Sequence, residues 1–264
     1  MSNTEIIWEL TSERVGNFLK EGKRLDKRAF DEYRKLEVRH GVSQNADGSA
    51  HVNLGGTEVV CGIKSELGTP YPDSQDQGSI SVGMELLPIA SPSFESGPPS
   101  SESIEIARVV DRGIRESGSL DFKKLCIKEG EKVWVVFIDL YALNDNGNLM
   151  DASSIAALAA LLDARTPKLE DDKIVRGEYD GKFKLERKPL LSTFAKIGNS
   201  VVIDPSLAEE KALQGRFSVA TTEDNYLTAF QKGYGGGFSF AEIDNCIETA
   251  LKKSKEIRKI VMKE

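Results

Sequence analysis

Three arginines recur at helical spacing in the segment that reads IEIARVVDRGIR, residues 104–115. On a helix, Arg108, Arg112 and Arg115 stand at positions i, i+4 and i+7 and share one face. The apolar residues fall on the opposite face, so this arginine stripe points away from the core. Because a guanidinium donates two parallel hydrogen bonds to a phosphate, the stripe is a candidate site for binding phosphate groups.

The same spacing also fits an ordinary solvated surface. Glu105, Asp111 and Glu116 stand close enough along the helix to form ion pairs with the arginines. Such exposed pairs are worth only about 0.2–0.5 kcal/mol each, so they would not keep a phosphate from competing. No aromatic residue interleaves the stripe, so a nucleic acid bound there would be held by its backbone and not by its bases. Periodicity leaves both interpretations open.

Acidic residues form a second candidate group in VVIDPSLAEE. Asp204 ends an apolar run, and Glu209 and Glu210 follow five and six residues later. Paired carboxylates can act as a general acid or hold a metal ion. They are equally typical of a strand end followed by the first turn of a helix, where acids are favoured.

The segment NDNGNLMDASS joins an apolar run to an Ala-rich helix, with Asp151 as the expected N-cap. Such a junction can hold an anion on the helix amides. It offers Asn148 and Leu149 but no cation, and its acids, Asp145 and Asp151, would repel phosphate. The turn therefore has the geometry expected of an anion site without the chemistry.

No other motif indicates a cofactor or a metal. His40 and His51 lie in strand-like segments without a partner motif, which favours structural roles. The sequence GYGGGF lacks the residues of a phosphate-binding loop and is expected to be a turn with unusual backbone angles.

The composition is that of a globular protein. The chain has 264 residues, 39% hydrophobic and 29% charged, and a net charge of −7. This charge argues against a protein that coats nucleic acid, so anion binding would need a local patch. Three scattered cysteines, no leader-like start and no apolar run of about 20 residues predict a cytoplasmic protein with reduced thiols.

The pattern of apolar residues predicts a mixed α/β (α+β) fold in two similar halves. We expect helices over 4–21, 100–117, 151–164 and 239–263, and strands within 34–42, 78–88, 131–145, 190–204, 215–223 and 225–233. The strand within 131–145 is expected to be buried on both faces. A hairpin is expected over 48–68, turning at Gly55 and Gly56, and a polar connection over 166–188.

The chain resembles the RNase PH family over nearly its whole length. The resemblance starts with RLDKRAFDEYRKLEVRHGVSQNADGSAHVNLGGTEVVCGIK (24–64) and continues through 104–117, 133–148 and 201–210. It implies the RNase PH fold, two βα subdomains of related topology packed together. We therefore divide the chain into a helical extension (1–23), subdomain 1 (24–166), a connection (167–188) and subdomain 2 (189–264).

The resemblance also implies hexameric rings that degrade RNA from its 3′ end with inorganic phosphate as the nucleophile. Asp204 and Glu210 match the acidic positions of catalytic members. Leu149 stands where those members have the arginine that grips phosphate, and Ser101 and Glu102 stand where catalytic archaeal subunits have paired arginines. This pattern is similar to that of the non-catalytic RNase PH-like subunit of the archaeal exosome.

We therefore expect a chain that is inactive alone, structures the active site of a catalytic partner, and binds RNA phosphates through Arg108, Arg112 and Arg115. The resemblance implies a ring of three such subunits and three catalytic ones, with an RNA-binding cap protein and no membrane partner. No catalytic residue, metal or cofactor of its own is expected, because phosphate is the co-substrate of the partner. The alternatives are a stand-alone phosphate-dependent 3′-to-5′ exoribonuclease, in which an arginine of the 23–39 cluster replaces the missing grip, and a scaffold without an RNA role.

Overall fold

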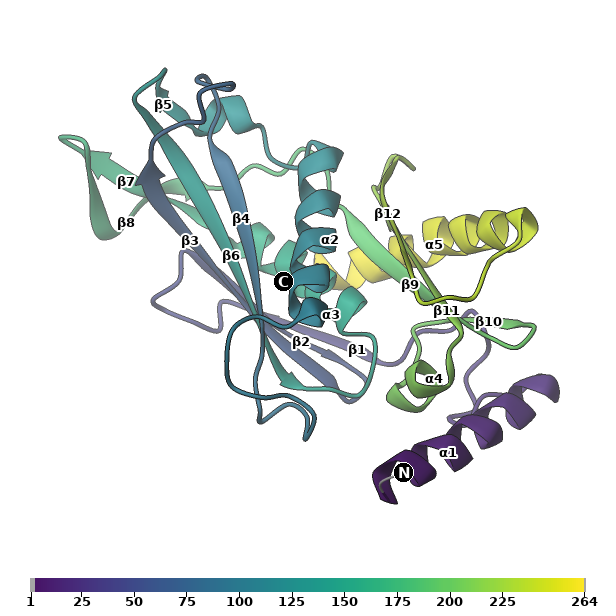
Figure 1. Ribbon diagram of the computed structural model, residues 1–264. Helices are drawn as coiled ribbons and strands as arrows, with labels where there is room; N and C mark the ends of the chain where they lie inside the picture. The colour runs from purple at the N-terminus through teal and green to yellow at the C-terminus, as the bar shows by residue number, and fades with distance from the viewer. Residues whose placement is uncertain (1–2, 264) are drawn as a thin grey trace.

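The described residues form two larger sheets with a buried helix between them, and a separate two-stranded sheet (Figure 1). This computed structural model describes residues 3–263, and the side chains of residues 3–8 lie outside the description, as do residues 1 and 2 of the expected N-terminal extension. The helices are α1 (Asn3–Lys20), α2 (Ser101–Ser117), the short 3₁₀ helix η1 (Phe122–Leu125), α3 (Leu149–Asp163), α4 (Leu207–Ala212) and α5 (Phe240–Val261). The strands are β1 (Leu36–His40), β2 (Gly48–Leu54), β3 (Thr57–Gly68), β4 (Ser79–Leu86), β5 (Cys126–Lys128), β6 (Lys132–Asn144), β7 (Arg165–Glu170), β8 (Lys173–Lys182), β9 (Leu190–Ile197), β10 (Ser200–Ile203), β11 (Gly215–Thr221) and β12 (Leu227–Gly233).

The first sheet has the strand order β1-β2-β3-β6-β4, with β5 also paired to β6. The predicted hairpin is confirmed, because β2 and β3 pair up to Leu54 and Thr57 and turn at the two glycines. Gly55 has φ 59°, a left-handed conformation that favours glycine. The expectation that β6 is buried on both faces is wrong, because its residues alternate between buried and half-buried.

The second sheet has the order β10-β9-β11-β12 and is antiparallel throughout. Helix α5 packs against β9 and β11. The predicted N-terminal helix is confirmed as α1, which buries Val15 and Leu19 against Ala195, Ile197 and Val202 of the sheet.

Helix α3 lies between the sheets, in contact with β2, β3 and β9. It is buried over almost its whole length, which explains why its sequence is Ala-rich: small side chains let strands approach from several sides. The prediction of Asp151 as N-cap is wrong. The helix begins at Leu149, and Asn148, with φ 57° and ψ 44°, is the N-cap that accepts a hydrogen bond from the Asp151 amide.

Helix α2 stands between β4 and β12, the strands at the ends of the two sheets (Figure 1). Ser100 caps its start, and Gly118, with φ 64°, ends it. Its buried residues include Ile106, Val109 and Val110, so the predicted amphipathic helix and its apolar face are confirmed.

The polar segment 166–188 is more ordered than the sequence suggested, because β7 and β8 form a hairpin within it. Both histidines contact other groups of the fold: His40 lies 3.1 Å from the Ala159 oxygen and 3.0 Å from the Val261 oxygen, and His51 pairs with Glu58. Within residues 3–263, no helix is long and apolar enough to cross a membrane and no group of three or more His, Cys, Asp or Glu is placed to hold a metal ion.

Candidate functional site: an arginine stripe beside a neutralised anion turn

The members of the arginine stripe differ in how strongly they are engaged. Arg115 pairs with Asp111, at 2.7 and 3.0 Å, and donates to the Ile80 oxygen of β4 at 3.2 Å. Arg112 donates to the Phe230 oxygen of β12 at 3.2 Å. Arg108 is exposed and has no hydrogen bond or ion pair with any described residue. Among the described residues, the stripe therefore offers one guanidinium without a partner, that of Arg108, and two that contact the strands at the ends of the sheets.

A recess of about 410 Å³ opens beside the stripe, between α2 and β4, and all three arginines line it. Of the acids that the spacing suggested as partners, Asp111 pairs with the stripe. Glu105 instead accepts from Arg216, at 2.6 Å, and from Gln231, at 2.8 Å. Glu116 also lines the recess, so three arginines face two acids there, an excess of one positive charge that suits a phosphate.

The turn before α3 is occupied by carboxylates of the chain itself. The Asn148 amide donates to Glu210 Oε1 at 2.8 Å, and the Asn148 side chain donates to Asp204 Oδ1 at 2.8 Å. The structure thus brings together the two acids that the sequence singled out, with Asn148 between them. An inorganic phosphate would need the place that Glu210 holds at this helix start.

Arg34 of the 23–39 cluster folds into this site, as the stand-alone alternative requires of one arginine of that cluster, although the sequence did not indicate which one. It donates to Asp204 from Nε at 2.9 Å and from Nη2 at 2.7 Å, and to the main-chain oxygens of Asn146 and Gly147. Its side chain is 9% exposed. The Arg34 guanidinium, which could replace the missing phosphate-binding arginine, therefore donates its hydrogen bonds to acceptors of the chain itself.

Asp204 is fully buried and also accepts from Arg28 Nη1 at 3.0 Å. Burial alone would raise the pKa of this carboxyl, but the hydrogen bonds and charge of Arg34 outweigh it and lower the pKa. Asp204 is therefore ionised at neutral pH and cannot supply a proton as a general acid in this arrangement.

The pKa values of the other two acids of the site, Glu210 and Asp151, are raised and not lowered. Burial raises the pKa of Glu210 to about 7, with the nearby Asp145 and Glu102 charges adding to the effect. Burial likewise raises the pKa of Asp151 to about 6, although Asn148, Thr193 and Tyr33 donate to it. Ionised carboxylates around the turn thus destabilise the folded protein. A bound phosphate would add further negative charge there.

A second ion pair next to the turn fixes the loop that carries Arg34. Arg24 and Glu209 are both buried and meet in a two-pronged contact, at 2.8 and 2.6 Å. Arg24 also donates to the oxygens of Ile203 and Asp204 at 2.9 Å. Glu209, which the sequence grouped with the candidate acids, is therefore a structural partner of Arg24.

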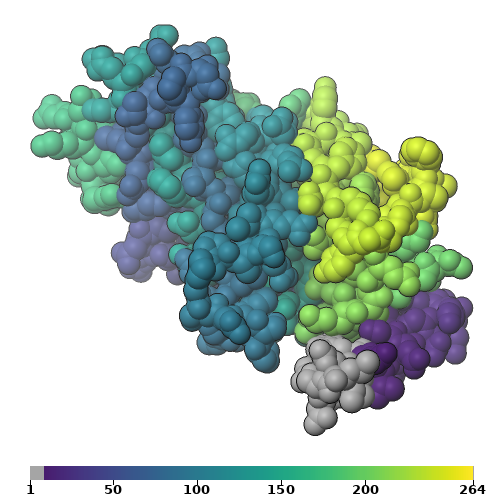
Figure 2. Space-filling view, viewed as in Figure 1, coloured from purple at the N-terminus to yellow at the C-terminus, as the bar shows by residue number. Residues whose placement is uncertain are grey.

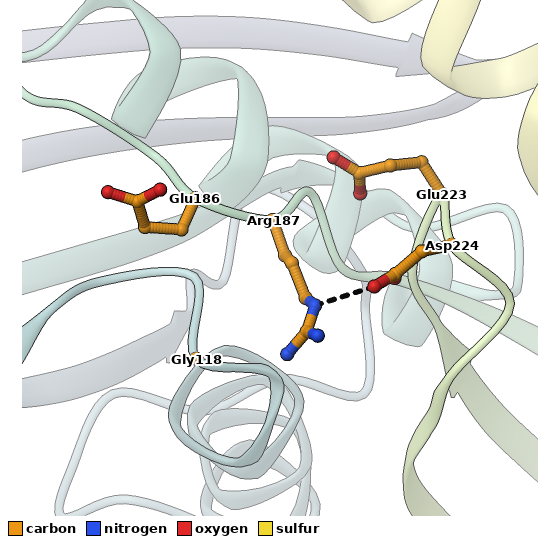
Figure 3. A pocket seen from close by; sticks show the side chains of 5 residues that line it. All are labelled: Gly118, Glu186, Arg187, Glu223 and Asp224. Carbon is orange, nitrogen blue, oxygen red and sulfur yellow. Dashed lines mark hydrogen bonds and ion pairs between the residues drawn. The ribbon is translucent and has the colours of Figure 1, made fainter.

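A second recess, of about 480 Å³, lies at the other end of α2 and has a structural explanation (Figure 3). Arg187 extends from the connection toward Asp224, with the two 2.9 Å apart, and also donates to the Ser117 oxygen at the end of α2 at 3.0 Å. The Arg187 guanidinium thus satisfies a main-chain oxygen at the end of α2 and pairs with Asp224, which gives it a structural role.

Two larger sheets that share one buried helix, with a turn of anion-binding geometry at the start of that helix, define a two-part α/β protein. The chain belongs to the 3′ exoribonuclease (RNase PH) family: domain 1 of that family matches residues 32–167 and domain 2 matches residues 189–253. The predicted fold and family are confirmed.

The similarity to archaeal proteins extends over nearly the whole chain. The exosome complex component Rrp42 of Pyrococcus horikoshii is 48% identical over 267 residues, covering 99% of this chain and 97% of that protein. The Rrp42 of Methanosarcina acetivorans is 46% identical over 255 residues, covering 97% and 94%. The chain belongs to the same family as these proteins.

Solved structures agree with the sequences. A chain of the Archaeoglobus fulgidus exosome with RNA bound to the active site superposes with a TM-score of 0.91 at 42% identity, covering 96% of this chain and 98% of that chain. A chain of an archaeal exosome core superposes with a TM-score of 0.89 at 37% identity, covering 99% and 100%.

Proposed function

We propose that this chain is the non-catalytic subunit of an archaeal exosome ring that degrades RNA from its 3′ end by phosphorolysis. The observation that carries the proposal is the occupied turn: Glu210 accepts from the Asn148 amide, and the donors of Arg34 go to Asp204 and main-chain oxygens. A phosphate nucleophile would have to displace Glu210 beside the buried Asp204, while the Arg34 guanidinium is already engaged by that carboxylate. The similarity to Rrp42 proteins supports the same assignment.

The arginine stripe then holds RNA phosphates at the interface with the catalytic subunit, and the chain structures that subunit's active site. Arg108 is the first contact, because its guanidinium is exposed and unpaired within the described part of the chain. Arg112 and Arg115 join when RNA phosphates compete with Phe230, Ile80 and Asp111 for their donors. Such contacts are to the RNA backbone and carry no sequence preference.

The proposed assembly is a ring of three such chains and three catalytic RNase PH-like subunits, with an RNA-binding cap protein, in the cytoplasm. The chain needs no cofactor of its own, because phosphate is the co-substrate of the partner. The subdomain boundaries 24–166 and 189–264 are part of the proposal, supported by the separate sheets of these two parts.

The first experiment is degradation of a short single-stranded RNA by the purified chain, with and without inorganic phosphate, scored as nucleoside diphosphates. We expect no phosphate-dependent product. Robust release of diphosphates would show that Arg34, Asp204 and Glu210 form a working site, and the chain would then be a stand-alone phosphorolytic exoribonuclease.

The second experiment tests the arginine stripe in the reconstituted complex. Arg108→Glu with Arg112→Glu should weaken RNA binding and lower the slope of log affinity against log salt by about 0.7 for each lost phosphate contact. Lys252→Glu with Lys255→Glu, exposed on α5, makes the same change in net charge and should leave the slope unchanged. If the two double variants behave alike, the stripe has no specific role in holding RNA and the scaffold interpretation stands.

A further inference from the structure

A groove of about 830 Å³ runs between the end of β4, the loop 87–100 and the first turn of α2. In Figure 2 this loop and α2 lie on the visible face, beside the C-terminal part of the chain. Met84, Leu86 and Phe94 contribute apolar surface to the groove. It is separate from the recess of the arginine stripe, which opens farther along α2.

The charged side chains around this groove are mostly acidic. Glu85, Glu95 and Glu102 line it, and Lys211 is its only lining cation among the described residues. All three glutamates are exposed. Partial desolvation and the charge of Asp145 raise the pKa of Glu102, so negative charge is concentrated at this end of α2.

An RNA phosphate would meet this surface with like charge, and binding there would be unfavourable. A cationic occupant is favoured instead. The groove is long and partly apolar, and one wall is the end of β4, the last strand of its sheet. Main-chain groups at a sheet edge pair readily with an extended polypeptide.

We propose that the groove of Glu85, Glu95 and Glu102 is a docking site for a basic, extended segment of a neighbouring ring subunit. This inference rests on the proposed function and deepens it, because it gives α2 two surfaces of opposite charge: Arg108 faces an interface that contains RNA, and Glu102 faces one that does not. At the interface without RNA, the carboxylates of this chain neutralise the basic segment of the neighbouring subunit. At the interface with RNA, the RNA phosphates neutralise the arginines.

The first test uses the full chain and an octapeptide that alternates arginine and valine, with binding followed by fluorescence anisotropy. Glu85→Gln, Glu95→Gln and Glu102→Gln together should weaken peptide binding at least tenfold. The control combines Glu13→Gln, Glu129→Gln and Glu248→Gln, three exposed acids outside the groove, and should change binding less than twofold. Equal losses in both triple variants would mean non-specific attraction and would overturn the docking site. Binding of octaadenylate RNA that weakens in the groove variant would also overturn it.

The second test is assembly with the purified catalytic subunit, measured by sedimentation. The groove variant should assemble more weakly than both the wild type and the control variant, and the wild-type chain alone should not self-associate through the groove. Normal assembly of the groove variant, or groove-dependent self-association, would overturn the docking proposal and leave the proposed function intact. Failure of the wild type to assemble with the catalytic subunit would overturn the proposed function itself.

Discussion

Replacing Glu210 with glutamine should make the stability of the protein less sensitive to pH. Burial raises the pKa of Glu210 from 4.5 to about 7 in the folded chain. Between these values the folded state binds more protons than the unfolded state, so the free energy of unfolding falls as pH rises. Over the whole window the loss is about 3 kcal/mol, since one pKa unit corresponds to about 1.4 kcal/mol.

The change is conservative in shape. A glutamine oxygen can still accept the 2.8 Å hydrogen bond from the Asn148 amide, while the buried charge is gone at every pH. Between pH 5.5 and pH 8.5 the wild type should lose about 2 kcal/mol of stability through this one group. Asp151, whose pKa is raised to about 6, adds a loss of the same sign in both proteins and cancels in the comparison.

The assay is urea unfolding at pH 5.5 and pH 8.5, followed by the fluorescence of the buried Trp134. We expect Glu210→Gln to be the more stable protein at pH 8.5 and to lose less stability than the wild type between the two conditions. Glu129→Gln, an exposed acid, is the control and should follow the wild type. If the wild type and Glu210→Gln lose equal stability between the two pH values, ionised Glu210 does not destabilise the folded protein. The argument that the turn disfavours a further negative charge then fails.

Three further changes test the elements that build the site. Asp204→Asn leaves the buried Arg34 without its counter-charge and should cost about 3–5 kcal/mol by urea unfolding, more than an exposed Asp→Asn change. Gly147→Ala should cost about 1–3 kcal/mol or more, because φ is +86° and the new Cβ would lie 2.4 Å from the Leu207 nitrogen; unchanged stability would show that the turn can shift freely. Ser239→Ala removes the cap of α5 and should lower stability by about 1 kcal/mol without changing RNA binding by the complex.

Most of the helices and strands were predictable from sequence because local signals agreed with the fold, but η1, β5 and the β7–β8 hairpin were not. The two glycines at 55 and 56 mark the β2–β3 hairpin, and the 3.6-residue spacing of Ile106, Val109 and Val110 marks the buried face of α2. The start of α3 was not predictable in the same way. Asn148 and Asp151 are both residue types that favour the N-cap position. The structure places Asn148 there, with a left-handed backbone conformation that the sequence does not reveal.

The centre of the site could not be predicted, because its charges pair across the whole chain. Arg24 and Arg34 look like members of an exposed basic cluster, yet their partners are Glu209 and Asp204 near the other end of the sequence. Each of these two arginines can be buried only because a carboxylate pairs with it, and the spacing of residues along the sequence does not show which carboxylate that is. The engagement of Arg112 by β12 is likewise a tertiary contact without a local signal.

An acid at a catalytic-type position does not by itself indicate catalysis. Asp204 holds Arg28, Arg34 and Asn148 together beneath the anion turn, and these contacts give it a structural reason to be present whether or not the chain turns over RNA. The inference about function therefore depends on which charges remain available to a ligand. In this chain Asp151 and Asp204 are buried and the half-buried Glu210 accepts from the Asn148 amide, while Arg108 is exposed and unpaired among the described residues. This difference between engaged acids and an available arginine is the basis of the proposal that the chain holds RNA for a neighbouring subunit.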